Sequence, residues 1–167
     1  MPGGSRQDFE EYARGAQRRL YRVAYLLCGD AEGARDLTQS TLARLFQHWR
    51  RVSAADSPDA YARTVLTRIY LSERRSGLRA LLAHRRAEVA APAPERPELR
   101  LTLLAALAQL PPRARAMVVL RYWEDLSVGT VAQLLDCSES TVKSQCSRSL
   151  ERLRGQLGEM HLYMAEG

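Results

Sequence analysis

The side chains best suited to contact chemistry lie near the carboxyl end. The segment CSESTVKSQCSRSLERLR, residues 137–154, combines short hydroxyl side chains with single cations. Hydroxyl groups donate and accept hydrogen bonds, while lysine and arginine reach phosphates and guanine edges. This combination predicts a helix that binds nucleic acid, and the alternative is an ordinary amphipathic surface helix. The expected contact residues are Ser140, Thr141, Lys143, Ser144, Ser147 and Arg148.

Residues for covalent, acid–base or metal chemistry are not grouped in this sequence. The three cysteines show no C-x-x-C spacing, and the three histidines do not cluster with them. No carboxylate cluster or glycine-rich phosphate loop is evident either. We therefore expect neither enzyme activity nor a metal or cofactor.

Charge is concentrated in one part of the chain. The formal net charge is +6, and residues 60–86 hold seven arginines against one glutamate, a net +6 that equals the whole excess. This segment indicates a polyanionic partner, or alternatively a solvated helix face followed by a basic linker. The first residues lack the apolar segment of a signal peptide, and no apolar run reaches the roughly 20 residues of a membrane span. We expect a cytoplasmic protein without direct membrane insertion.

The elements that must position these residues are all predicted to be helices. Apolar residues recur at helical spacing from Phe9 to Leu27, and Gly29 suits the left-handed position that ends a helix. Asp30 can cap a second helix, residues 31–49, with an apolar side and a polar side. Residues 51–59 are predicted to form a loop, and Ser57-Pro58 to start a basic helix over residues 59–75.

The carboxyl-terminal part predicts a helix-turn-helix. Helices are expected over residues 99–110 and 113–125, and Ser127 can cap a short helix over residues 128–135. Asp136 tolerates the left-handed conformation of a tight turn, and Ser138 can cap the helix that follows. An apolar stripe on that last helix packs inward: Val142, Cys146, Leu150, Leu153 and Leu157.

The expected fold class is all-α, with two small helical domains joined by a flexible linker. The proline-rich stretch APAPERP disfavours helix within residues 76–98, which are predicted to be the linker. The predicted domains are therefore residues 1–75 and residues 99–157, followed by a tail at residues 158–167.

Two blocks of the sequence resemble a known family. The stretches LPPRARAMVVLRYWEDLS and STVKSQCSRSLERLR resemble the fourth conserved region of bacterial sigma factors of the extracytoplasmic-function (ECF) class. GDAEGARDLTQSTLARLFQHWRRV and PDAYARTVLTRIYLSERR resemble the second region. The resemblance covers roughly residues 8–157 and is strongest to the actinobacterial SigE-like subgroup. It implies that the amino-terminal domain is sigma region 2 and that the carboxyl-terminal helix-turn-helix is sigma region 4.

The resemblance also implies partners and roles. Such proteins bind core RNA polymerase, through the clamp helices of its largest subunit and its flap, and direct it to promoter DNA. An anti-sigma factor restrains them, in some cases at the membrane. Residues matching the clamp contact are Asp36, Gln39, Ser40 and Ala43. Residues matching the −10 element contact are Trp49, Arg50, Arg51, Tyr61, Arg63, Thr64, Thr67 and Arg68. The six residues of the last helix match the reader of the −35 element.

The sequence leaves four points open. Trp49 either stacks on a flipped base or belongs to the core. Arg68 stands where related sequences often have asparagine, and Ser140 where they often have glycine, which bears on base preference and on how closely the last helix approaches DNA. The competing function is a helix-turn-helix transcriptional regulator with an amino-terminal sensing or dimerisation domain.

Overall fold

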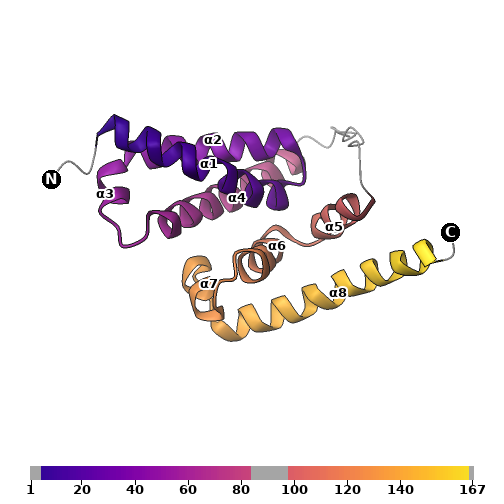
Figure 1. Ribbon diagram of the computed structural model, residues 1–167. Coiled ribbons are helices and arrows are strands. Elements are labelled where there is room, and N and C mark those ends of the chain that lie inside the picture. The colour runs from indigo at the N-terminus through magenta and orange to yellow at the C-terminus, as the bar shows by residue number, and fades with distance from the viewer. Residues whose placement is uncertain (1–4, 84–97, 166–167) are drawn as a thin grey trace. The chain divides into compact units, whose positions relative to one another are not determined.

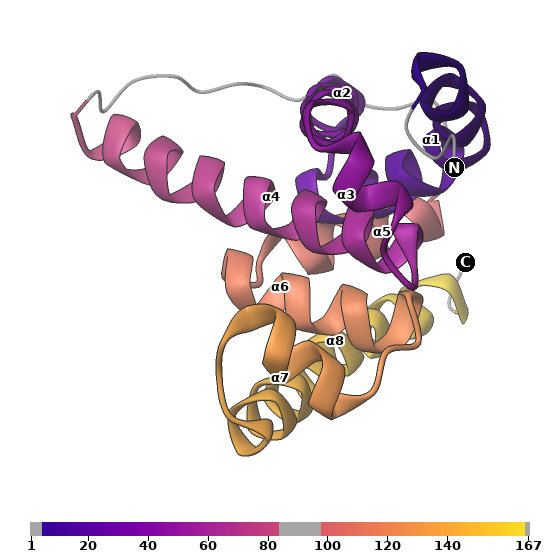
Figure 2. The same ribbon diagram turned by 90° about the vertical axis from the view of Figure 1, so that its left-hand side faces the viewer.

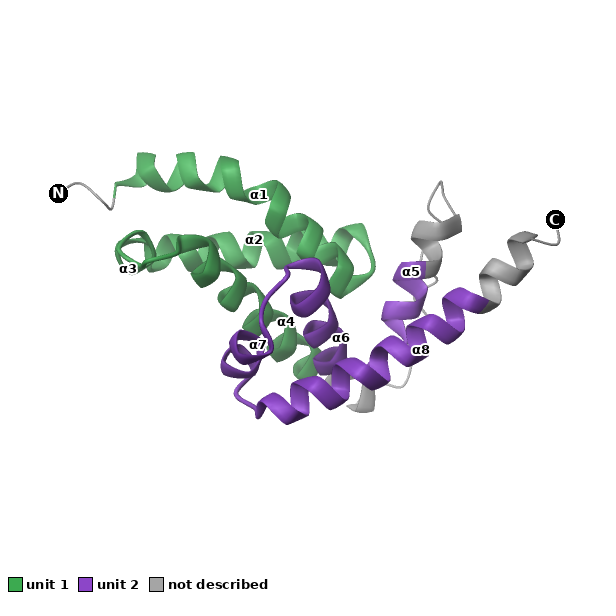
Figure 3. Cartoon of the chain, turned by 60° about the horizontal axis from the view of Figure 1, so that its bottom comes forward, with its two compact units in different colours: residues 1–89 green, residues 90–167 purple. Residues whose placement is uncertain are grey.

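The chain folds into two compact helical units. The structure, a computed structural model, describes residues 5–83 and 98–165, with side chains at residues 5–77 and 103–158 (Figure 1). The units comprise Met1–Val89 and Ala90–Gly167 (Figure 3). The described residues form helices joined by short turns and contain no strand. The predicted all-α class with two helical units is confirmed.

The described residues of unit 1, 5–83, form four helices. α1 and α2 are joined by the two-residue turn that the sequence predicted, with Gly29 at φ 80° and the Asp30 carboxylate accepting from the N–H of Gly33 at 2.6 Å. α4 packs against both, and Figure 2, where α2 is seen end-on, shows α4 crossing it. The bounds are α1 Arg6–Cys28, α2 Ala31–Gln47, α3 Trp49–Ser53 and α4 Pro58–Ala83.

The core of unit 1 is made by apolar side chains from all four helices. Burying one such side chain contributes roughly 1.5–3 kcal/mol relative to leaving it exposed. Because each helix contributes at least one, the outward faces of the helices are held in fixed orientations. The largest fully buried or nearly fully buried side chains are Leu27, Leu37, Leu45, Val52, Leu66 and Tyr70.

The helix boundaries of unit 1 differ from the prediction in two places. α2 ends at Gln47 because His48 has a non-helical conformation, φ −117° and ψ 23°. The five-residue helix α3 then begins at Trp49 and runs to Ser53, into the loop that was expected over residues 51–59. α4 runs on to Ala83, into the predicted linker, because residues 80–83 are alanine and leucine, the strongest helix formers. The proline-rich stretch of the predicted linker lies outside the described residues.

Over residues 98–165, unit 2 forms four α-helices and one π-helical turn. Its core includes Met117, Leu120, Val131 and Val142, each at most 1% exposed. The bounds are α5 Glu98–Ala108, α6 Pro112–Val118, η1 Val119–Trp123, α7 Val128–Leu135 and α8 Glu139–Ala165.

Unit 2 also departs from two expectations. The helix predicted over residues 113–125 changes to π geometry, where the N–H of Glu124 bonds to the carbonyl of Val119 at 3.1 Å. Asp125 then takes a left-handed φ of 53° and ends the segment. α8 continues to Ala165, so the predicted tail is largely helical; no proline interrupts it, and Met, Leu and Ala favour helix there.

Candidate nucleic-acid interface

α7 and α8 form the helix-turn-helix of unit 2. The side chain of Ser127 accepts from the N–H of Thr130 at 3.1 Å and caps α7. Asp136, at φ 54°, makes the left-handed turn, and Ser138 caps α8 by accepting from the N–H of Thr141 at 3.1 Å. All three local predictions are confirmed. These caps fix the direction in which α8 leaves the turn.

α8 has one buried face and one exposed face, as its sequence pattern predicted. Val142 is fully buried, and Cys146 and Leu153 are 4% and 6% exposed. Thr141 lies at the boundary, half-buried, with its hydroxyl 2.8 Å from that of Ser138. The other predicted contact residues all lie exposed on the helix surface: Ser140, Lys143, Ser144, Ser147 and Arg148.

Some exposed side chains of α8 already form hydrogen bonds within the chain, while others do not. The hydroxyl of Ser140 lies 3.1 Å from that of Ser138, and the hydroxyl of Ser144 donates to the carbonyl of Thr141 at 3.2 Å. Lys143 and Arg148 form no ion pair with any described residue. The two cations are therefore available for an anionic partner, with small hydroxyl groups between them that allow a close approach.

Two arginines of α6 hold the surrounding helices by donating to carbonyl groups at helix ends. The guanidinium of Arg113 donates to the carbonyl of Leu135, the last residue of α7. Arg115 is 6% exposed and donates to the carbonyls of Ala108 and Leu110, at 2.9 and 3.1 Å, where α5 ends. Carbonyls at helix ends lack partners within the helix, so these bonds satisfy them. Sequence reasoning missed both roles; the signal was an arginine at an inward helical position.

The π turn places two aromatic side chains on the surface. Tyr122 and Trp123 are 50% and 54% exposed. The preceding Arg121 donates to the carbonyl of Leu126 at 2.6 Å, and its guanidinium lies 5.5 Å from the centre of the Tyr122 ring. Arg121 therefore closes the turn after η1.

In unit 1, α4 carries five of the predicted −10 residues, and their exposure differs. Arg68 is exposed, while Tyr61, Arg63 and Thr64 are half-buried. Thr67 is fully buried, and its hydroxyl donates to the carbonyl of Arg63 at 2.9 Å. In this fold its side chain belongs to the core, and its contact with DNA stays a prediction.

Trp49 also lies in the core of this structure. It is 8% exposed, and its ring centre lies 5.4 Å from that of Phe9 and 5.2 Å from that of Tyr12. With aromatic rings packed against it, it does not present a free stacking surface. Arg50 and Arg51, which follow it on α3, are exposed as predicted.

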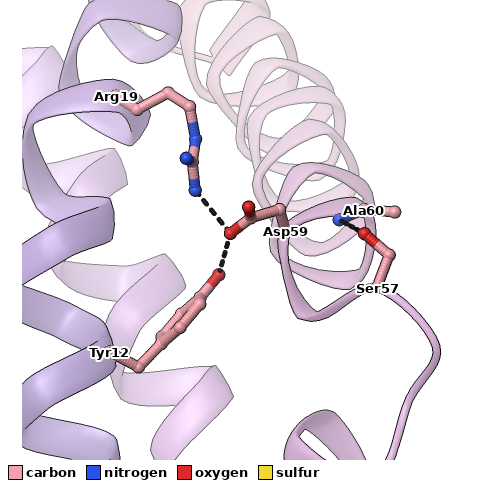
Figure 4. A network of polar contacts seen from close by, with 5 residues as sticks. All are labelled: Tyr12, Arg19, Ser57, Asp59 and Ala60. Atoms are coloured by element: carbon pink, nitrogen blue, oxygen red, sulfur yellow. Dashed lines mark hydrogen bonds and ion pairs between the residues drawn. The ribbon is translucent and has the colours of Figure 1, made fainter.

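A polar network ties the start of α4 to α1 (Figure 4). One carboxylate oxygen of Asp59 accepts from the hydroxyl of Tyr12 at 3.0 Å and from Arg19 at 2.5 Å. Ser57 caps α4 by accepting from the N–H of Ala60 at 3.1 Å. Burial, and then the hydrogen bond to Asp59, raise the pKa of Tyr12 well above its usual range. The network ties the first turn of α4 to α1.

The polar face of α2 is free and continuous. Asp36, Gln39, Ser40 and Ala43 are all exposed, and the buried residues Leu37, Thr38 and Thr41 lie on the opposite side. None of the four makes a side-chain hydrogen bond or ion pair to another described residue. The structure thus brings the predicted clamp-binding residues onto one surface.

The cysteines and the possible metal ligands were also located in the described part of the chain. The cysteines are free, and burial raises the pKa of Cys28 to about 11 and also raises that of Cys146. Within residues 5–83 and 98–165, no three His, Cys, Asp or Glu side chains group closely enough to hold a metal ion. No helix in these ranges has both the length and the apolar character needed to span a bilayer.

The capped α7, the left-handed turn and the amphipathic α8 define a helix-turn-helix protein. Two family models match the chain in order. Residues 13–80 match "Sigma-70 region 2", and residues 100–153 match "Sigma-70, region 4". Together these matches cover more than half of the sequence.

Named relatives are similar over most of the chain. The chain is 36% identical over 161 residues to "RNA polymerase sigma-E factor" of Streptomyces coelicolor, which covers 90% of this chain and 86% of that protein. It is 32% identical over 148 residues to "ECF RNA polymerase sigma factor SigL" of Mycobacterium tuberculosis, covering 84% of each. The chain belongs to the sigma-70 family, in its extracytoplasmic-function class.

A solved structure shares the fold. The sigma factor RpoE, crystallised with the anti-sigma factor NepR from Bartonella quintana, matches with a TM-score of 0.76 over 91% of this chain and 98% of that chain, at 24% sequence identity. The two-unit helical fold predicted from the sequence is therefore also that of a known sigma factor.

Proposed function

We propose that this chain, as an ECF sigma factor, binds core RNA polymerase and directs promoter recognition, melting and transcription initiation. The observation that carries the proposal is the pair of region 2 and region 4 matches, in family order, on two separate helical units. Two DNA-binding units in one chain contact two promoter elements at once and gain from each other's effective concentration. The functional domains would be residues 1–75 and 99–157, with the connection between them as the tether.

For the −35 element, we assign the reader to the exposed face of α8. A recognition helix enters the major groove with its first turns, and Ser138 starts α8 so that Ser140, Lys143 and Ser144 face outward there. Arg148, one turn further on, reaches a guanine edge or a phosphate. Arg113 is a positioning residue, because it ties α6 to the end of α7 directly before the turn.

For the −10 element, we assign Arg50 and Arg51 of α3 together with the outward residues of α4, namely Tyr61, Arg63, Thr64 and Arg68. Exposed cations suit the sugar–phosphate backbone of a melting strand. Thr67 and Trp49 are left out because their side chains are buried. The network of Tyr12, Arg19 and Asp59 would hold this surface in place.

The exposed polar face of α2, with Asp36, Gln39, Ser40 and Ala43, is assigned to the clamp helices of the polymerase. The flap of the polymerase would contact unit 2. The RpoE structure contains an anti-sigma factor, and we extend that kind of partner to this chain. Such a partner would hold the chain inactive in the cytoplasm, or at the membrane if the partner is itself a membrane protein.

Run-off transcription with purified core polymerase on a random promoter library tests the proposal. We expect transcripts from a defined set of promoters only when core and chain are both present. A chain that forms a stable dimer, binds a palindromic duplex without core and fails to initiate with core would instead be a classical repressor or activator.

A further inference from the structure

The outward face of α1 carries a row of cations that the proposed function does not use. Arg14, Arg18 and Arg22 recur every four residues, and all three side chains are exposed. They lie opposite the buried side of the helix, which includes Ala16 and Leu20. None of the three forms an ion pair or a hydrogen bond with another described residue.

The row is regular. With a rise of about 1.5 Å per residue, neighbouring arginines stand about 6 Å apart along the axis and the row spans about 12 Å. Successive members are rotated by about 40°, so all three stay on one side of the helix. This spacing is comparable to the separation of successive phosphates along an extended single strand.

Few acidic groups offset this charge. Glu10 is paired with Arg6 at 3.1 Å, which leaves Glu11 as the acidic residue of the same outward side. Arg19 is not part of the row, because it is paired with Asp59. Three arginines against one glutamate leave the outward face positively charged.

Two aromatic rings share the face. Tyr21 and Tyr25 lie on the same side of α1, half-buried, with ring centres 6.0 Å apart and ring planes inclined by 31°. Arginine and tyrosine together are the pairing that single-stranded nucleic acid uses, cations for phosphates and rings for bases. An acidic peptide would match the charge but would leave the rings unused, and the bases of a duplex are already stacked.

We propose that the outward face of α1, formed by Arg14, Arg18, Tyr21, Arg22 and Tyr25, binds a single strand of nucleic acid. The arginines contact successive phosphates, and the tyrosines stack on bases. The surface is distinct from the polar face of α2 and from the basic face of α4. Its binding does not depend on core polymerase, so it is measured with the chain alone.

Fluorescence anisotropy with a labelled oligothymidine and the full chain, over a range of salt concentrations, tests this surface. Each phosphate contact on a single strand contributes about 0.7 to the magnitude of the slope of log affinity against log salt. We therefore expect the slope to fall by about 2 in magnitude in the triple variant Arg14→Gln, Arg18→Gln, Arg22→Gln. The control is Arg35→Gln, Arg44→Gln, Arg154→Gln, the same change of charge at other exposed helix positions. We expect it to keep the wild-type slope.

The aromatic contribution is tested separately. The double variant Tyr21→Leu, Tyr25→Leu should bind oligothymidine about fivefold or more weakly, because stacking is worth about 1–3 kcal/mol per base. The slope of log affinity against log salt should not change. Tyr21→Phe with Tyr25→Phe retains the rings and the affinity, which guards against a folding defect in the leucine variant.

Two results would overturn the proposal. One is a triple-arginine variant that keeps both the wild-type affinity and the wild-type slope, which would make the row a solvated surface. The other is displacement of the oligonucleotide by polyglutamate as readily as by unlabelled oligothymidine of equal charge, which would assign the face to acidic protein segments.

Discussion

Arg113→Met should loosen the recognition helix without touching DNA. Arg113 is half-buried, and its guanidinium donates to the carbonyl of Leu135 at the end of α7. A hydrogen bond to a charged group contributes about 1.5–3 kcal/mol, and its loss leaves a helix-end carbonyl without a partner. Methionine keeps much of the side-chain volume, so the lost bond should dominate. We expect the free energy of unfolding of unit 2 to fall by about this amount.

Amide hydrogen exchange followed by NMR measures this loss where it occurs. The amides of Val142 and Cys146, in the buried part of α8, should exchange about 10- to 150-fold faster, while those of α2 in unit 1 stay unchanged. Arg154→Met serves as the control, because Arg154 is exposed on α8, and it should change the unfolding free energy by less than about 0.5 kcal/mol. If Arg113→Met leaves exchange in α8 at the wild-type rate, the bond to Leu135 does not stabilise the helix-turn-helix.

The other predictions concern the proposed surfaces and the network at the start of α4. Arg148→Ala should cost about 1–3 kcal/mol of −35 binding by the holoenzyme without changing thermal stability, and an unchanged −35 preference would remove it from the reader. Asp36→Arg should abolish co-purification with core while circular dichroism stays native; normal co-purification would argue against the clamp assignment. The pKa of Tyr12 is raised in the folded chain from an ordinary 10.0, so on raising the pH the unfolded chain loses this proton first. The contribution of Tyr12 to the free energy of unfolding should therefore be full below about pH 10 and fall above it. Tyr12→Phe should reduce that alkaline fall in urea unfolding, and an identical pH profile would contradict the network.

The sequence predicted best those features that depend on neighbouring residues. Gly29 with Asp30, Ser127, Asp136 and Ser138 each act within one turn of helix, and the structure confirms each of them. The amphipathic pattern of α8 was equally local, because burial of Val142 and Cys146 follows from helical periodicity.

Features that depend on contacts between distant segments could not be predicted in this way. Thr67 matches a DNA contact in the sequence and Trp49 could be either a base contact or a core residue, yet the structure buries both side chains. Asp59 meets Tyr12 and Arg19 across 47 and 40 residues of sequence, and nothing local signals that meeting. The acceptor of Arg113 likewise lies 22 residues away, so its identity could not be predicted from neighbouring residues.

The central claim is that promoter recognition needs both units and the polymerase together. The most direct measurement is a footprint on a promoter recovered from the run-off library, with the chain alone, with core alone and with both. We predict protection of the −35 and −10 elements only when chain and core are combined. Specific protection by the chain alone, or none when core is added, would contradict the claim.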